Sequence, residues 1–115
     1  MKHNGGLEFR KISDDEYEFK TEIQDYHINA GGVTHGGFIM SMLDSGMGTA
    51  AHQVIEGKAV TISLNTNFIG GSKAGDEIIG FAKIKKKTRS LIFMYGHLKC
   101  EDKLLASAEG IWKII

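Results

Sequence analysis

The chain has 115 residues, 42% hydrophobic and 24% charged, a composition typical of one compact globular domain spanning residues 1–115. Its 14 Lys and Arg residues balance 14 Asp and Glu residues, so charge gives no argument for binding nucleic acid or an anionic membrane surface. The single cysteine excludes an internal disulfide, no apolar run is long enough to cross a membrane, and the polar start does not resemble a secretory signal. We therefore expect a cytoplasmic protein.

The first elements predicted along the chain are two strands joined by a turn. Apolar and polar residues alternate over residues 7–11 and again over residues 17–23. The polar residues 13–16 between them are typical of a turn, so we expect a β-hairpin. Residues 25–34 are rich in Gly and Asn and have no periodicity, which indicates a loop.

The segment from Gly36 to about Ile55 is predicted to form one long helix, and Gly57 follows where a helix stop belongs. Many of its residues are small, and the apolar ones recur at helical spacing. These apolar residues are Phe38, Ile39, Met42, Leu43, Met47, Ala50, Ala51 and Val54. Because such a helix is apolar or small on nearly every side, we expect it to be buried.

Four further strands are predicted after the helix, at residues 59–68, 77–87, 90–100 and 104–115. In the first of them, four apolar residues alternate with polar ones and are expected to share one face: Val60, Ile62, Leu64 and Phe68. The short connections between the strands require antiparallel neighbours. One long apolar helix among about six antiparallel strands predicts an α+β domain in which a curved sheet wraps around a central helix.

The start of the helix and one acidic residue within it carry the candidate chemistry. His35, Gly36 and Gly37 stand where free backbone N–H groups and the positive end of the helix dipole meet, and glycine leaves these groups uncovered. This is a suitable place to hold a carbonyl oxygen as it becomes an oxyanion. Asp44 lies within the apolar helix, where a carboxylate is costly unless it is paired or used. It could act as a general base or as a nucleophile.

The spacing of these residues predicts a shared site. Eight helical residues separate Gly36 from Asp44, a rise of about 12 Å at roughly 1.5 Å per residue. Asp44 therefore cannot reach a carbonyl held at the start of its own helix. The two features can meet only if Asp44 comes from a second subunit whose helix runs alongside in the opposite direction. We therefore expect a dimer with two sites at its interface.

The pattern Asn29-x5-His35-Gly36-Gly37-x6-Asp44 at the start of a helix, with the later turn from Phe68 to Asp76, resembles the hotdog-fold thioesterases of the phenylacetate-degradation and acyl-CoA thioesterase 13 type. The resemblance extends from about Asn29 to the end of the chain. Two features of that family are missing, because the chain has no proline after Asn29 or in the turn at residues 70–71, and no N-terminal helix is predicted.

This resemblance implies a hydrolase that acts on acyl-CoA thioesters without a metal or a cofactor. It implies a homodimer or a dimer of dimers with active sites at the subunit interface. In such a site Asp44 activates water or attacks the carbonyl, the Gly36 N–H polarises the carbonyl, and His35 assists. Asn29 helps to position substrate or water, and Thr61, on the strand after the helix, hydrogen-bonds near the Asp.

One basic cluster remains, formed by Lys85, Lys86, Lys87 and Arg89. Such a cluster usually lies on a solvated strand end, but it could bind the phosphates of CoA, with Gly37 also contacting substrate. Two other functions stay open. A non-catalytic acyl-CoA-binding module on the same fold would not need Asp44, so that residue favours the hydrolase. A hydratase or dehydratase would pair an Asp with a His on the loop before the helix, and the order of these residues here does not fit.

Overall fold

The computed structural model describes residues 2–4, 7–22, 36–71 and 75–115, which form one helix and seven strands. The elements are β1 (Lys2–Asn4), β2 (Leu7–Lys11), β3 (Glu16–Glu22), α1 (Gly36–His52), β4 (Ala59–Phe68), β5 (Glu77–Lys87), β6 (Leu91–Cys100) and β7 (Lys103–Ile114). The strands make a single antiparallel sheet in the order β1-β2-β3-β5-β6-β7-β4. The expected α+β architecture is confirmed.

The structure has one strand more and a shorter helix than the sequence predicts, and the other bounds agree to within one residue. The sheet has one strand more than the expected six, because Lys2–Asn4 pairs with β2. Three polar residues carry no alternation that would signal a strand, so only the pairing partner reveals it. The helix ends at His52, before the predicted end near Ile55. The side chain of His52 accepts a hydrogen bond from the backbone N–H of Ala59 at 3.1 Å, which holds the start of β4 against this helix end.

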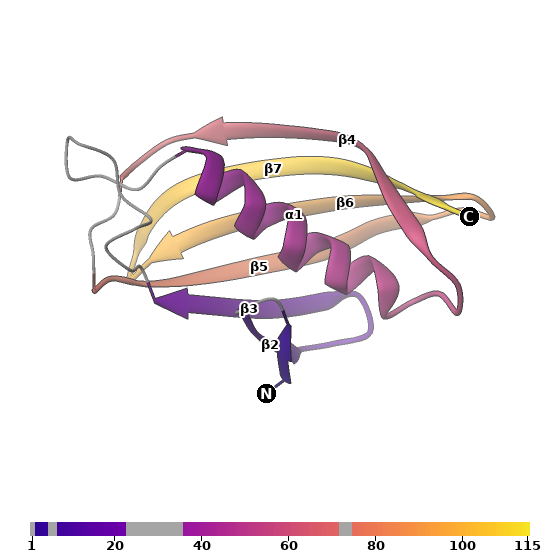
Figure 1. Ribbon diagram of the computed structural model, residues 1–115, viewed down its shortest axis with the longest axis horizontal. Helices are drawn as coiled ribbons and strands as arrows, with labels where there is room; N and C mark the ends of the chain where they lie inside the picture. The colour runs from indigo at the N-terminus through magenta and orange to yellow at the C-terminus, as the bar shows by residue number, and fades with distance from the viewer. Residues whose placement is uncertain (1, 5–6, 23–35, 72–74) are drawn as a thin grey trace.

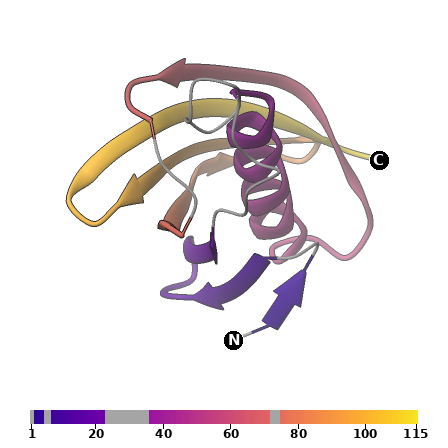
Figure 2. The ribbon, with the colours of Figure 1, turned by 60° about the vertical axis from the view of Figure 1, so that its left-hand side comes forward.

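The sheet curls, and α1 crosses its concave face (Figures 1 and 2). The core lies between them. The helix contributes Ile39, Met42, Leu43, Met47, Ala50 and Ala51, and the sheet contributes Ile78, Ile92, Met94, Leu98, Leu105 and Trp112. All of these side chains are 5% exposed or less, so the expected apolar packing of the helix is confirmed on this side. The helix in the described part of the chain is neither long nor apolar enough to span a membrane.

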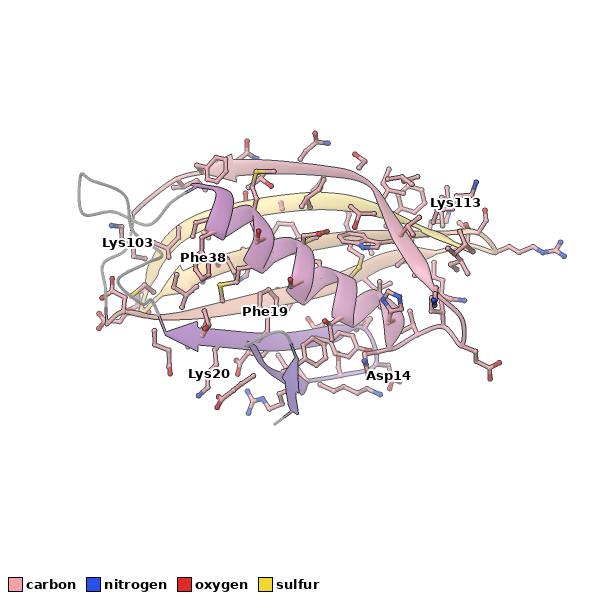
Figure 3. The ribbon with its side chains drawn as sticks, viewed as in Figure 1. Asp14, Phe19, Lys20, Phe38, Lys103 and Lys113 are labelled. Atoms are coloured by element: carbon pink, nitrogen blue, oxygen red, sulfur yellow. The ribbon has the colours of Figure 1, made fainter. Side chains whose placement is uncertain are left out.

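Two glycines let the helix approach the sheet closely. Phe19 rises from β3 toward α1 (Figure 3) and is fully buried. Its ring fills the space where a Cβ would stand on Gly46 of the helix and on Gly80 of β5. The absence of side chains at these two positions therefore allows one aromatic ring to pack between the two layers.

Strand β4 lies at one edge of the sheet and pairs only with β7 among the described strands. Its register with β7 shifts between Thr61 and Ser63, so Ile62 is the extra residue of a β-bulge. The bulge breaks the expected alternation, because Thr61 now faces the helix on the same side as Leu64. The predicted apolar face of this strand is therefore wrong. Val60 is 44% exposed and Ile62 is 53% exposed.

Candidate active site

Asp44 and Thr61 form the centre of the candidate site. Asp44 lies halfway along α1 on the helix face that the sheet does not cover, and it is exposed. The Thr61 hydroxyl, turned toward the helix at the bulge of β4, donates a hydrogen bond of 2.9 Å to Oδ1 of Asp44. This bond fixes the orientation of the carboxylate. Within the described residues no donor reaches Oδ2, so this oxygen is available to water or substrate.

Two hollows meet at this Asp44–Thr61 pair. The first has a volume of about 350 Å³ and extends toward the C-terminal end of α1. Its described lining is mostly polar and comprises Asp44, Ser45, Gly48, Thr49, His52, Gln53, Ala59, Thr61 and Trp112. The second, of about 290 Å³, extends toward the N-terminal half of the helix and is lined by Met40, Ser41, Asp44, Thr61 and Leu64. A ligand whose reacting atom lies at Asp44 can therefore extend in two directions, one polar and one more apolar.

The histidine in the polar hollow is not a free base. Nε2 of His52 accepts the backbone N–H of Ala59, so Nδ1 must carry the ring proton. Nδ1 lies 2.8 Å from the Gly48 carbonyl oxygen, to which it donates. Because both ring nitrogens are engaged, His52 ties the helix end to β4 and has no lone pair left for proton transfer. Asp44 remains the candidate base of this site.

The other predicted site residues are described only in part. Gly36 begins α1, and Gly37 is exposed in the first helical turn, with open space where a Cβ would stand. A ligand oxygen could therefore approach the backbone of this turn. Asn29 and His35 lie outside the described residues.

The basic cluster divides between two places. Lys85 donates to Glu109 at 2.9 Å and lines a small hollow with Phe93 and Ile111, apart from Asp44. Lys87 and Arg89 instead line a hollow of about 500 Å³ at the C-terminal end of α1, which also contains Gln53. Lys86 is exposed near the end of β5. Only Lys87 and Arg89 are thus placed beside the polar hollow, through their shared neighbour Gln53.

Most of the residues that line the polar hollow were not predicted from the sequence. Ser45 and Thr49 of the helix and Gln53 just after its end recur every four residues and so form one polar stripe. That stripe was the available signal, but the small residues around it suggested burial on every side. In the described part of the chain, no group of three His, Cys, Asp or Glu side chains is placed to hold a metal ion.

A single helix held in the curl of an antiparallel sheet, with a carboxylate on the uncovered helix face, defines a hotdog-fold protein. Residues 31–107 match the family model described as the thioesterase superfamily. The chain belongs to this superfamily, and its chemistry is thioester hydrolysis.

Two relatives are similar to most of this chain in sequence. A Pseudomonas aeruginosa protein whose name proposes esterase activity is 30% identical over 94 residues, covering 80% of this chain and 70% of that protein. Mouse acyl-coenzyme A thioesterase 13 is 32% identical over 89 residues, covering 74% of this chain and 63% of the mouse protein.

The solved structures agree on the fold. A phenylacetic acid degradation-related protein from Ralstonia eutropha superimposes with a TM-score of 0.89 at 24% identity, covering 95% of this chain and 85% of that one. A Streptococcus pneumoniae protein crystallised with coenzyme A has a TM-score of 0.86 at 17% identity, covering 95% and 85%. At these identities the likeness establishes the hotdog fold.

Proposed function

We propose that this protein hydrolyses acyl-CoA thioesters, with Asp44 as the general base or nucleophile. The observation that carries the proposal is the Asp44 carboxylate, oriented by Thr61 and exposed where two hollows meet on a thioesterase fold. The similarity to acyl-coenzyme A thioesterase 13 and the coenzyme A in the Streptococcus pneumoniae structure support CoA as the carrier.

As a base, Asp44 accepts a proton from a water molecule, whose oxygen attacks the thioester carbonyl carbon. The carbonyl oxygen becomes an oxyanion, which backbone N–H groups at a helix start stabilise. Collapse of the intermediate breaks the C–S bond, and the proton held by Asp44 passes to the departing CoA sulfur. As a nucleophile, Asp44 would instead attack the carbonyl carbon and expel the CoA thiolate, which takes up a proton from solvent. The resulting anhydride is then cleaved by water, which releases the acid and restores the Asp44 carboxylate.

The oxyanion donor in this proposal is the N–H of Gly36 of the partner subunit. Within one helix, Gly36 and Asp44 are about 12 Å apart along the axis at roughly 1.5 Å per residue. The edge of β4 that pairs with no described strand supports a dimer, because two such edges related by a two-fold axis pair in antiparallel fashion. The two helices then also run antiparallel, so each helix start faces the middle of its partner. Asn29 and His35 act from the same side as Gly36.

Exposed apolar side chains support this face as the interface. Eight large apolar residues are exposed among the described residues, and five of them lie on β4, just after it, or on the uncovered side of α1: Met40, Val60, Ile62, Phe68 and Ile69. Such a concentration on one side is typical of a surface that is covered in the assembled protein. Lys87 and Arg89 are then the candidates to bind the CoA phosphates, with Lys86 nearby.

The test is thiol release from a panel of aryl- and alkyl-acyl-CoAs by the wild type and by Asp44→Asn. We expect the variant to lose activity by a factor on the order of 10² to 10⁴ with its fold intact. Asp102→Asn, an exposed carboxylate in the connection between β6 and β7, is the matched control and should keep full activity. Hydrolysis that is unaffected by Asp44→Asn would reject the assigned role. Binding of acyl-CoA without hydrolysis of any panel member would favour the binding-module alternative.

A further inference from the structure

The polar hollow beside Asp44 is lined in part by Trp112, whose indole N–H has no acceptor among the described residues. Trp112 of β7 is 1% exposed, yet it lines this hollow together with Gly48 of α1. Apart from the neighbouring residues and the backbone of the helix itself, the atom nearest to the position of a Cβ on Gly48 is Nε1 of this tryptophan, at 3.5 Å. The indole nitrogen therefore lies beside the helix at a position where the helix has no side chain. No described residue accepts a hydrogen bond from it.

Packing does not explain the glycine at position 48. A Cβ at Gly46 would overlap Phe19, but a Cβ at Gly48 would make only an ordinary contact. Glycine in the middle of a helix is less favourable than alanine, so a position that could accept alanine without a clash calls for another reason. The reason that the geometry offers is access, because a methyl group at position 48 would fill the space in front of the indole N–H.

The chemistry of the hollow restricts what the N–H can bind. Indole nitrogen is only a donor, so the ligand must present an acceptor. The Asp44 carboxylate at one end of the hollow disfavours a second anion, so the acceptor is an uncharged oxygen. The side chains of Ser45 and Thr49 on the same wall are also polar, which fits an amide or hydroxyl better than a hydrocarbon chain.

Resting on the proposed function, we infer that Trp112 and Gly48 form a subsite in which the indole N–H donates to an uncharged carbonyl or hydroxyl oxygen of the thioester substrate. Two parts of the substrate carry such oxygens. One is the pantetheine arm of CoA, with its amide carbonyls, and the other is an oxygen-bearing acyl group. The direction of the hollow favours the arm, because Gln53 joins it to the hollow that contains Lys87 and Arg89. The acyl group would then occupy the more apolar hollow near Met40 and Leu64.

The subsite has a built-in reporter, since Trp112 is the only tryptophan of the chain. Coenzyme A and the uncharged 4-hydroxyphenylacetamide are titrated separately while the intrinsic fluorescence is recorded. The first probe carries the arm without an acyl group, and the second carries a hydroxyl-bearing acyl group without the arm. We expect a saturable shift of the emission to longer wavelength with coenzyme A. A shift with 4-hydroxyphenylacetamide alone would keep the subsite and assign it to the acyl group.

Gly48→Ala is the variant that tests the mechanism. It should weaken binding of the active probe by about tenfold, the loss expected when one hydrogen bond to a buried donor is blocked. It should also raise the unfolding midpoint, because alanine favours the helix, so weaker binding could not be ascribed to a damaged fold. Trp112→Phe should raise KM by a similar factor, and the double variant should be no worse than either single one, because both remove the same hydrogen bond.

Two results would overturn the inference. One is a wild type whose fluorescence responds to neither probe although it hydrolyses acyl-CoA. The other is a Gly48→Ala variant that binds both probes as the wild type does. In either case the thioesterase proposal stands. A fluorescence response in a protein that hydrolyses no thioester would instead reject that proposal and leave the subsite in place.

Discussion

The hydrogen bond between Thr61 and Asp44 is the smallest unit on which the proposed activity depends. A carboxylate on an exposed helix face can rotate freely unless something holds it, and here the only described donor is a strand hydroxyl at a bulge. The bulge is therefore part of the site, because without the extra residue Ile62 the strand would turn Thr61 away from its neighbour Leu64. Position and orientation of the reacting group come from two different elements.

We predict that Thr61→Val lowers kcat by a factor on the order of 10 to 100 with little change in KM, the loss expected for a hydrogen bond to a charged group. Thr61→Ser keeps the hydroxyl and should retain most of the activity. Steady-state kinetics of thiol release for both variants provide the measurement. A Val variant as active as the Ser variant would mean that the hydroxyl does not position Asp44.

A second residue-scale prediction concerns His97 on the sheet. Its ring stacks on Phe81 with centroids 5.1 Å apart, and Nδ1 lies 3.2 Å from the Tyr95 hydroxyl. Burial of the ring, together with the positive charge of Lys99, lowers the pKa of His97 below its ordinary value. The unfolded chain therefore takes up this proton first as the pH falls, so the stability that His97 provides is present above about pH 6.5 and decreases below it.

The midpoint temperature of thermal unfolding of the wild type should consequently fall as the pH is lowered from about 7.5 to about 5.5, because the folded state resists protonation of His97. His97→Phe preserves a ring against Phe81 and removes the titrating group, so its midpoint should fall less over the same range. The measurement is the difference between the two pH profiles. Parallel profiles would show that other groups account for the whole effect.

At the scale of elements, the helix α1 combines two glycines with opposite consequences. Gly46 faces Phe19 and Gly80, where there is no room for a methyl group, whereas Gly48 faces the open hollow beside Trp112. Helix propensity alone would treat the two positions alike. Their difference is a property of what packs against each side of the helix.

We predict that Gly46→Ala destabilises the protein by about 1–3 kcal/mol, because the added methyl group overpacks the core against the Phe19 ring. Gly48→Ala, the matched substitution one half-turn away, should stabilise it by roughly 0.5–1 kcal/mol. Urea unfolding followed by circular dichroism measures both. Phe19→Leu in the Gly46→Ala background should recover part of the loss. If both substitutions changed the free energy of unfolding in the same direction, this account of the helix packing would be contradicted.

The helix α1 and the strand β4 show what could and could not be predicted from the sequence. Local patterns predicted the helix and the strands β2 to β7, because apolar periodicity and glycine turns are local signals. The bulge in β4 is not a local signal, since it depends on the register with Trp112 and Ile111 of the neighbouring strand. For the same reason the exposed face of α1 was missed, because its small polar residues do not tell whether a strand or a ligand lies beside them.

The candidate site residues also differ in whether a local sequence pattern reveals them. Asp44 could be singled out from the sequence because a carboxylate among apolar helix residues is unusual. Trp112 could not, because a buried aromatic residue on a strand normally fills the core, and only the distance between its Nε1 and the position of a Cβ on Gly48 places this donor beside the hollow. Whether a donor finds an acceptor depends on its three-dimensional surroundings rather than on the residue type.

At the scale of the whole molecule, the free edge of β4 and the uncovered side of α1 lie together on one side of the domain. This side contains the exposed apolar residues of β4 as well as Asp44 and both hollows around it. A dimer formed through this side would shelter the apolar residues and supply the helix start that the site lacks. In this arrangement the assembled dimer, and not the single chain, is the catalytic unit.

A complementation experiment tests this arrangement directly. Asn29→Ala and Asp44→Asn proteins, each inactive by our proposal, are dissociated, mixed in equal amounts and reassembled. If Asn29 of one subunit acts with Asp44 of the other, each mixed dimer contains one intact site and one doubly altered site. Random reassembly makes about half of the dimers mixed, so about a quarter of the wild-type activity should return. Asp102→Asn mixed with Asp44→Asn is the control, in which activity should follow the fraction of intact Asp44.

The experiment distinguishes a site shared between subunits from a site within one subunit, because Asn29 and Asp44 are altered in different chains. If both acted within one subunit, every chain in the mixture would still carry one disabling substitution, and no activity could return. Mixed dimers, verified by a size tag on one of the two proteins, that remain inactive would therefore reject the shared site. Return of activity would in turn require that the helix start of one chain lies within reach of Asp44 of another, which is the antiparallel helix pairing that a two-fold contact between β4 edges produces.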